Sequence, residues 1–119
     1  MWYDIIIIIK SQVERTEKSM TIVYVASAFR GNVEENLAKA RIYCRLAAKA
    51  GYLPVAPHLL YPQFLDDNDP EERELGMQLG LHLLALCDEV WCFGKITEGM
   101  AREIKEAEDL CIPVIYKED

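Results

Sequence analysis

The run from Thr21 to Gly51 most constrains the fold of this 119-residue chain. It begins with a β-branched and apolar segment (21–26), passes through a short loop of small and polar residues, and ends in a long amphipathic stretch. This order predicts a strand, a loop and a helix. Asn32 is the predicted N-cap, Glu35 completes a variant capping box, and Gly51 ends the helix in the left-handed conformation. Apolar residues at steps of three and four predict one buried helix face, formed by Val33, Leu37, Ala40, Cys44, Ala47 and Ala48.

The loop before this helix offers a place to bind an anion. Backbone N–H groups at a helix N-terminus are unpaired and carry partial positive charge. Gly31 allows a ligand to approach the backbone, and Arg30 offers a forked donor suited to phosphate or carboxylate. The alternative is an ordinary strand–helix turn with a solvated arginine, and Glu34 and Glu35 favour it by cancelling part of the helix dipole. The residues of the loop leave both interpretations open.

Length and charge predict one domain whose partner is not a nucleic acid. A chain of 119 residues can bury one sizeable core, and a net charge of −7 with a pI near 4.8 leaves no basic surface for phosphate backbones. No C-x-x-C pair is present, and each cysteine lies in or beside an apolar segment. We therefore expect buried, reduced thiols of a cytoplasmic protein, and neither a disulfide framework nor a metal site, from Cys44, Cys87, Cys92 and Cys111.

The N-terminus carries an unusual run of five isoleucines, Ile5–Ile9. The run is too short to cross a membrane, and no membrane partner is expected. It could form an added edge strand, a surface for self-association, or part of an extension before the domain proper. We divide the chain into an extension (1–19) and one domain (20–119). Because an exposed apolar run favours strand pairing and aggregation, we expect this run to be covered.

The remaining chain repeats the alternation of strand and helix. A short apolar strand (53–56) follows Gly51 and completes a right-handed βαβ unit with parallel strands. Asp69 caps a helix with Pro70 in its first position, and the predicted buried face of that helix consists of Leu75, Leu79, Leu83 and Leu86.

A third strand (88–93) follows, with Asp88 as a structural cap at its amino end. Thr97 caps the last helix (98–110), whose inner face is predicted as Met100, Ile104, Ala107 and Cys111, and residues 112–116 form a final strand. These elements predict an α/β fold: a Rossmann/flavodoxin-like three-layer sandwich with a mainly parallel sheet of four to five strands.

The long loop 57–68 follows the second strand at the edge where parallel sheets bind ligands. His58 and Tyr61 are therefore candidate pocket residues. The alternative is a packed loop with a hydrogen-bonded histidine. Gly76 and Gly80, one helical turn apart, allow the close approach of another backbone or of a ligand, with tight helix packing as the simpler explanation.

Two helix starts face this same edge, because Thr97 and Gly99 repeat the hydroxyl and glycine of the first loop. Glu103 lies in the second turn of the last helix, where its side chain would point back toward the ligand edge. It is a plausible nucleophile or base. The alternative is one more surface glutamate on a helix that carries several.

Three segments (23–31, 87–91 and 97–104) together resemble the nucleoside 2-deoxyribosyltransferase-like superfamily. The resemblance covers about Thr21 to Tyr116. It is strongest to a bacterial and phage branch related to 2′-deoxynucleoside 5′-phosphate N-hydrolases. In those enzymes a glutamate attacks the anomeric carbon and forms a covalent deoxyribosyl intermediate, which water or a second base resolves. No cofactor takes part.

The resemblance gives Glu103 the place of the nucleophile. Ser27, Arg30 and Gly31 match the first phosphate loop, and Thr97 and Gly99 match the second. Two neighbours within the same motifs complete the predicted ligand-binding set, Phe29 and Met100. Relatives complete their pockets with residues of a neighbouring subunit, which implies a homo-oligomer.

Two positions depart from the enzymes. Gly80 falls where they carry an aspartate that positions the sugar or assists the leaving base, and Ala28 replaces a hydroxyl of the phosphate loop. The side chains that could supply the proton instead are Glu74, Asp66, Asp67 and His58. Three hypotheses follow: an enzyme of N-glycosidic cleavage or deoxyribosyl transfer, a non-catalytic sensor or sponge for an ADP-ribose-like signal, and an oligomeric scaffold with a vestigial pocket.

Overall fold

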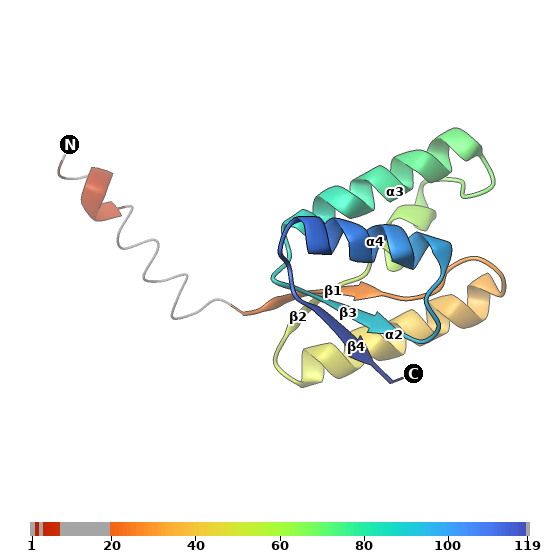
Figure 1. Cartoon of the computed structure of the whole chain (residues 1–119), viewed down its shortest axis with the longest axis horizontal. Helices are drawn as coiled ribbons and strands as arrows, with labels where there is room; N and C mark the ends of the chain where they lie inside the picture. Colours follow the sequence, from red (N-terminus) through yellow and green to blue (C-terminus); the bar gives the residue numbers. More distant parts are fainter. Residues whose placement is uncertain (1, 3, 8–19, 119) are drawn as a thin grey trace.

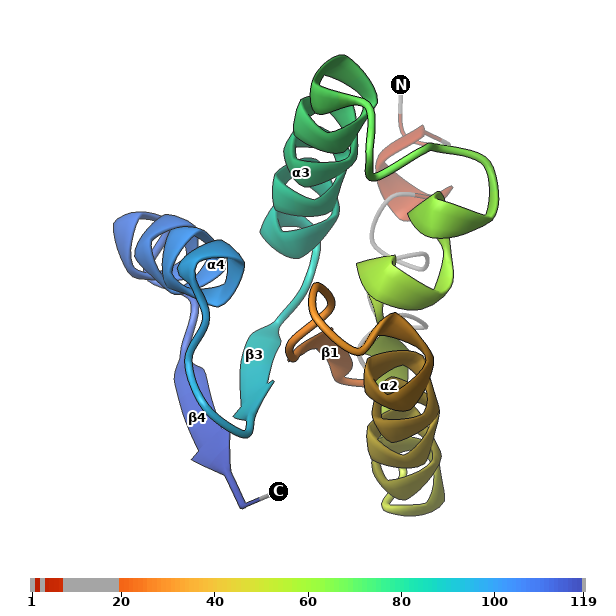
Figure 2. The ribbon, with the colours of Figure 1, turned by 90° about the vertical axis from the view of Figure 1, so that its right-hand side faces the viewer.

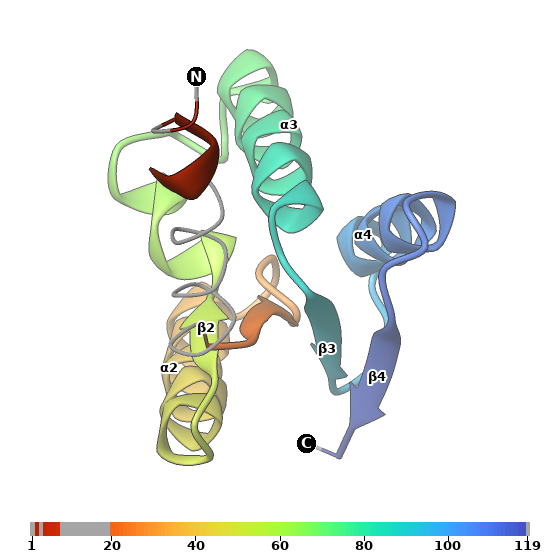
Figure 3. The same cartoon turned by 90° about the vertical axis from the view of Figure 1, so that its left-hand side faces the viewer.

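The computed structural model describes residues 2, 4–7 and 20–118. Within 20–118 the chain forms one sheet of four parallel strands in the order β2-β1-β3-β4 (Figure 3). Its members are β1 (Ile22–Ala26), β2 (Leu53–Val55), β3 (Glu89–Phe93) and β4 (Val114–Lys117). The predicted α/β class and parallel sheet are confirmed.

Helices cover both faces of the sheet, with α2 (Val33–Lys49) on one face and α3 (Pro70–Ala85) and α4 (Glu98–Asp109) on the other (Figures 1 and 2). Right-handed crossovers explain this division. The chain steps from β1 outward to β2 and then back across β1 to β3, so the helix changes face when the direction changes. Two short 3₁₀ turns, η1 (Pro57–Leu59) and η2 (Tyr61–Gln63), lie in the predicted long loop.

Alternation along the strands builds two separate cores. On β1, Val23 and Val25 pack toward α2, whereas Tyr24 and Ala26 pack toward α3 and α4. On β3 the aromatic side chains face α2, and smaller ones face the opposite side. The two faces therefore differ in the volume of the side chains that fill them.

The predicted caps are confirmed. The side chains of Asn32, Asp69 and Thr97 accept hydrogen bonds from backbone N–H groups in the first turns of α2, α3 and α4, at 3.2, 3.1 and 3.2 Å. Gly51 has φ +94°, as expected of the residue that ends α2. Asp88 accepts a hydrogen bond from the Ile22 backbone N–H at 2.8 Å, which ties the amino ends of β3 and β1 together.

The predicted buried face of α2 was partly wrong. Val33 and Ala48 are exposed, and Tyr43, which was not predicted, is buried. Its ring stacks on Phe93 with centroids 4.0 Å apart and an interplanar angle of 7°. The face of α2 that packs on the sheet therefore consists of Ala40, Tyr43 and Ala47.

The leucine face of α3 was also misplaced. Leu75 and Leu86 are exposed, and the buried residues of α3 are Gly80 and Leu84. A β-carbon added at Gly80 would lie 3.3 Å from the hydroxyl of Tyr24 and 3.7 Å from Pro57, so the helix lies close to the sheet there.

On α4, Cys111 is exposed and Glu103 is buried, contrary to the predicted apolar face. Cys111 lies just past the helix end with φ +58°, outside the helix whose face was predicted. All four cysteines are free. The prediction of buried thiols holds for Cys87 and Cys92 only, since Cys44 is half-buried.

The described part of the isoleucine run is helical rather than an added edge strand, and Ile5, Ile6 and Ile7 are about half exposed. The expectation that the run is covered is therefore wrong for these three residues. Ile8 and Ile9 lie outside the described residues. In the described part of the chain, no helix combines the length and apolar character needed to span a membrane.

Candidate active site

A cavity of about 330 Å³ opens at the carboxyl edge of the sheet. Its walls come from the segments that follow β1, β2 and β3 and from the side of α3. The strand order reverses between β1 and β3, and crevices at such switch points are where parallel sheets bind ligands. The volume is at the lower end of the range found for small-molecule sites.

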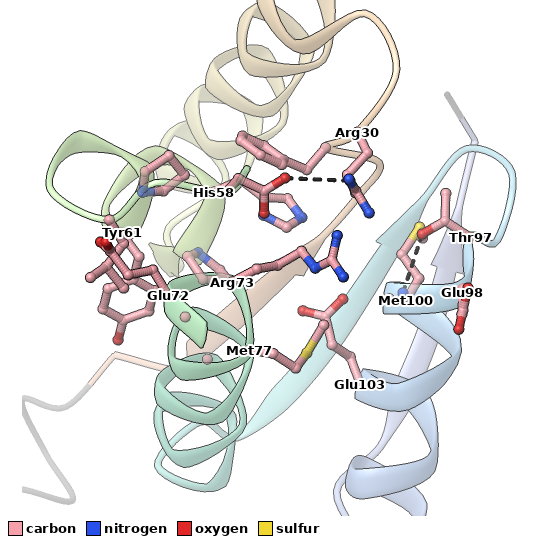
Figure 4. A pocket seen from close by; sticks show the side chains of 18 of the residues that line it. Arg30, His58, Tyr61, Glu72, Arg73, Met77, Thr97, Glu98, Met100 and Glu103 are labelled. Atoms are coloured by element: carbon pink, nitrogen blue, oxygen red, sulfur yellow. Dashed lines mark hydrogen bonds and ion pairs between the residues drawn. The ribbon is translucent and has the colours of Figure 1, made fainter. Parts of the chain in front are cut away.

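Glu103 lies at the bottom of this cavity and is only 3% exposed. The hydroxyl of Tyr24, also buried, donates a hydrogen bond to its carboxylate oxygen Oε2. Tyr24 comes from the middle of β1, which pairs with a strand on each side, and the bond orients the carboxylate. Figure 4 shows the Glu103 side chain pointing from α4 into the cavity.

The surroundings of Glu103 favour its neutral form. Burial raises the pKa of this carboxyl from its ordinary value of 4.5 to about 7, and the hydrogen bond from Tyr24 opposes that rise. Burial, together with the negative charge of Glu103, raises the pKa of Tyr24 well above its usual range. Tyr24 thus keeps its proton, and Glu103 titrates near neutrality. A carboxyl tuned in this way inside a cavity is a candidate for a functional role.

At the mouth of the cavity, Arg30 and Asp67 form an ion pair with Nε and Oδ2 3.4 Å apart. The pair joins the loop after β1 to the segment before α3. Both side chains line the cavity, and the guanidinium of Arg30 is well exposed. Arg30 and Glu103 therefore share one cavity, as the predicted anion loop requires.

His58 is held against this wall by two contacts. Its ring stacks on Phe29 with centroids 5.0 Å apart, and its Nε2 lies 2.9 Å from the backbone oxygen of Ser27. A carbonyl oxygen can only accept, so Nε2 carries the ring hydrogen and Nδ1 keeps its lone pair. Burial lowers the pKa of His58, against smaller opposing effects of Ser27 and Asp67. Near neutral pH, His58 therefore serves as a hydrogen-bond acceptor rather than as a proton donor.

Most residues predicted for the site line the cavity. These are Phe29, Arg30, His58, Tyr61, Thr97, Gly99, Met100 and Glu103. Ser27 and Gly31 do not. Ser27 is buried beside the cavity, and its hydroxyl has no hydrogen-bond partner among the described residues. Gly31 adopts φ +101° and so gives the loop its turn.

Arg73, on α3, also lines the cavity and was not predicted. Figure 4 shows its side chain extending into the cavity from the wall opposite Thr97. A signal for it exists in the sequence: Arg73, Gly76 and Gly80 recur at steps of three and four residues, so they share one face of a helix. The two glycines mark the face that a ligand can approach, and Arg73 is the charged residue on that face.

The acids considered as replacements for an aspartate at position 80 fall into two groups. Asp67 lines the cavity, whereas Asp66 does not, and Glu74 binds Arg102 on α4 with N–O distances of 3.1 and 3.2 Å. A β-carbon added at Gly80 would lie 3.3 Å from the Tyr24 hydroxyl. Tyr24 thus occupies the space beside Glu103 that a second acid would need.

No cluster of three or more histidine, cysteine or acidic side chains suited to a metal ion occurs among the residues that the structure describes. The lining combines apolar surface with a few polar groups on opposite walls, which is the usual composition of a site for a small organic ligand.

The sequence profile of the family described as "Domain of unknown function (DUF7768)" matches residues 21–117, and the chain belongs to this family. Among solved structures, the chain is similar to a 2-deoxyribosyltransferase from the psychrotolerant bacterium Bacillus psychrosaccharolyticus, described as a suitable biocatalyst for the industrial synthesis of antiviral and antitumoral nucleosides. The TM-score is 0.68 and the identity 18%, over 82% of this chain and 72% of that chain. No curated protein matches.

At this identity the likeness shows the fold alone, and that fold is the predicted one. The narrower relation to a bacterial and phage branch, and to N-hydrolases, stays a prediction.

Proposed function

We propose that this protein binds a nucleoside or its 5′-phosphate and cleaves or transfers its N-glycosidic bond, with Glu103 as the nucleophile. The observation that carries the proposal is the buried carboxyl of Glu103, oriented by Tyr24 and open to a cavity that Arg30 also lines. The 2-deoxyribosyltransferase fold neighbour supports a nucleoside as the ligand class.

The two helix starts provide the anchor for the phosphate. Backbone N–H groups at the start of α4, beside Thr97 and Gly99, attract an anion, and Arg30 adds a cation from the neighbouring loop. With its phosphate bound at this edge of the sheet, the nucleotide would have its sugar over the carboxyl of Glu103. The Glu103 carboxylate then attacks the anomeric carbon and forms a glycosyl ester, which water or a second base opens.

The hydrogen bond from Tyr24 serves this reaction in two ways. It holds one oxygen of Glu103 and leaves the other for attack, and it counteracts the rise in the pKa of Glu103 that burial causes. The nucleophile must be ionised. Base release should therefore increase with pH through about 7.

Chromatography of the free base tests the proposal. Wild type, Glu103→Ala and Arg30→Ala are incubated with nucleosides and with their 5′-monophosphates. We expect release by wild type, none by Glu103→Ala, and weaker use of the phosphorylated substrates by Arg30→Ala. Arg45→Gln, an exposed substitution on α2, is the control for loss of positive charge. Equal release by wild type and Glu103→Ala would overturn the role of Glu103.

One observation favours a second candidate, a protein that binds a nucleotide-derived signal without turnover. Among the described lining residues, Glu103 is the only buried carboxyl, and the space beside Gly80 holds the hydroxyl of Tyr24 instead of a second acid. Submicromolar binding of an ADP-ribose-like ligand, with no base released from any nucleotide, would establish this alternative.

The proposal includes a homo-oligomer as the working form. The cavity is open at one side in the single chain, and a neighbouring subunit would close it. Gel filtration of dilute protein tests this part, with elution at the mass of one chain as the contrary result.

A further inference from the structure

Cleavage of an N-glycosidic bond leaves an electron pair on the departing base, and the cavity contains few groups that could protonate it. The Tyr24 hydroxyl donates to Glu103, and the His58 N–H points to the backbone oxygen of Ser27. A carboxyl acts as a general acid near neutral pH only where burial raises its pKa, and the buried carboxyl here is the nucleophile itself.

The other lining carboxylates are already engaged or exposed. Asp67 pairs with Arg30, and Glu72 accepts a hydrogen bond from the backbone N–H of Asp66 at 3.1 Å. Glu98 is exposed at the start of α4. None of these three acids is buried, so none has the desolvation that would keep a carboxyl protonated.

Arg73 differs from all of these groups. Arg73 is exposed; side-chain hydrogen bonds lower the pKa of the neighbouring Glu74, and the charge of Arg73 adds to that effect. The Arg73 guanidinium, however, has no hydrogen bond and no ion pair within the described part of the chain, whereas Arg30, the other lining arginine, pairs with Asp67. Figure 4 shows Arg73 reaching into the cavity from α3, in the direction of the Glu103 carboxylate.

The wall that carries Arg73 is the one that suits a base. The start of α4, which attracts phosphate, lies across the cavity from Arg73 (Figure 4), and the loop after β1 adjoins the segment before α3 through the ion pair of Arg30 and Asp67. Beside Arg73, α3 and the loop before it supply an apolar set of lining residues: Tyr61, Pro62, Leu65, Gly76 and Met77. A flat heterocycle buries its apolar surface on such a wall, where its edge would meet Arg73.

From this arrangement we propose that Arg73 binds the departing base and stabilises it as an anion, so that the site selects bases with carbonyl acceptors at their edge. The inference rests on the proposed function and names its substrate class: nucleotides of oxo-substituted bases such as uracil, thymine and hypoxanthine. A guanidinium fork pairs with a carbonyl and a neighbouring ring nitrogen, as it does on the edge of guanine, whereas adenine has an amino donor in place of that carbonyl.

The reaction balances without a general acid. A Glu103 oxygen forms a bond to the anomeric carbon while the bond from that carbon to the base nitrogen breaks, and the electron pair stays on the base. The base leaves as an anion paired with Arg73. Water then displaces Glu103 from the anomeric carbon, and the proton of that water neutralises the base.

The test compares leaving groups of different acidity. Initial rates of base release are measured with dUMP, 5-fluoro-dUMP and dAMP for wild type, Arg73→Gln and Tyr61→Phe, with Arg45→Gln as the charge control. Fluorine makes the departing uracil anion more stable, so it should compensate in part for the stabilisation of that anion by Arg73.

We expect Arg73→Gln to release uracil about 100-fold more slowly, mainly through kcat, which is the low end of the loss found for one electrostatic contact to developing charge. The deficit should shrink to a few-fold with 5-fluoro-dUMP. Wild type should use dUMP far better than dAMP, and Arg45→Gln should behave as wild type.

Three results would overturn the inference. One is an equal deficit of Arg73→Gln with dUMP and 5-fluoro-dUMP. Another is a ratio of the rates with dUMP and 5-fluoro-dUMP that changes in Tyr61→Phe and not in Arg73→Gln, which would make the Tyr61 phenol the proton donor. The third is equal use of dAMP and dUMP. Absence of release from every nucleotide would refute the proposed catalytic function and, with it, a leaving-group role for Arg73.

Discussion

The two faces of the sheet are formed by the same strands, but one is filled by packed aromatic rings and the other borders the cavity. On the α2 face, Tyr43, Trp91 and Phe93 pack ring against ring and leave that side filled. On the α3 and α4 face, the strands present smaller side chains and one long polar one, Tyr24, which reaches Glu103 beside the cavity.

The difference shows how one small domain separates stability from function. A buried carboxyl with a raised pKa destabilises the fold, because its ionisation must occur away from water. Aromatic packing on the far face stabilises the same strands. Substitutions on the two faces should therefore affect different measurements, and three experiments examine this division, with a fourth on a residue outside both faces.

The largest effect is expected on the α2 face. Tyr43→Ala removes a buried ring and leaves a cavity against Phe93, and should lower the free energy of unfolding by about 3–5 kcal/mol. Urea denaturation measures the loss. Ile42→Ala is the matched control. Ile42 precedes Tyr43 and is 56% exposed, so its truncation should change the free energy of unfolding little. Similar losses in both variants would show that Tyr43 does not hold this face together.

The second effect is a pH dependence of stability due to Glu103. Its pKa is about 7 in the folded protein and near 4.5 in an unfolded chain, so between these values the folded state binds more protons. The free energy of unfolding should fall as pH rises from about 5 to 8, by about 2–3 kcal/mol from this group.

Glu103→Gln removes this titration and keeps an acceptor for the Tyr24 hydroxyl. It should match wild type near pH 5 and be the more stable protein at pH 8. Glu108→Gln, an exposed change on the same helix, should follow the wild-type curve. Parallel curves for wild type and Glu103→Gln would mean that Glu103 ionises in its ordinary range.

The third effect concerns activity. Tyr24→Phe removes the hydrogen bond that lowers the pKa of Glu103, so the pH at which base release reaches half its maximum should move upward. At pH 7 the rate should fall about 5-fold if the pKa rises by about one unit, because the ionised fraction of Glu103 falls by that factor. Tyr52→Phe, which alters a ring packed on Trp91 outside the cavity, should leave the profile in place. An unmoved profile in Tyr24→Phe would remove Tyr24 from the mechanism.

The smallest expected effect is a change in stability at a residue that belongs to neither face of the sheet. Cys111 adopts φ +58° just after α4, a conformation that glycine tolerates best. Cys111→Gly should raise the free energy of unfolding by about 0.5–1 kcal/mol. Cys111→Ala keeps the β-carbon and should give no such gain, and a gain in both variants would point to the thiol instead of the backbone.

The architecture could be predicted from the sequence because it depends on local signals. Asn32, Asp69 and Thr97 mark the helix starts, and short connections impose parallel strands. The buried faces were less predictable, because Tyr43 and Gly80 are placed by what lies opposite them, Phe93 and Tyr24, and no spacing within one helix reveals that.

The site was partly predictable for the same reason. Residues just after strands, such as Arg30 and His58, follow from the topology of a parallel sheet. The bond between Tyr24 and Glu103 joins positions 79 residues apart, and the position of Arg73 depends on how α3 lies over the sheet. Such contacts arise only in three dimensions.

The most direct test of the central claim is to trap the sugar on the protein. Wild type is incubated with a 2′-fluoro-arabinosyl uracil 5′-phosphate, whose fluorine slows opening of a glycosyl ester, and the intact protein and its peptides are weighed by mass spectrometry. The account predicts a mass increase equal to one fluoropentosyl phosphate, located on Glu103 and absent from Glu103→Gln. An adduct on another residue, or uracil release with no adduct, would contradict it.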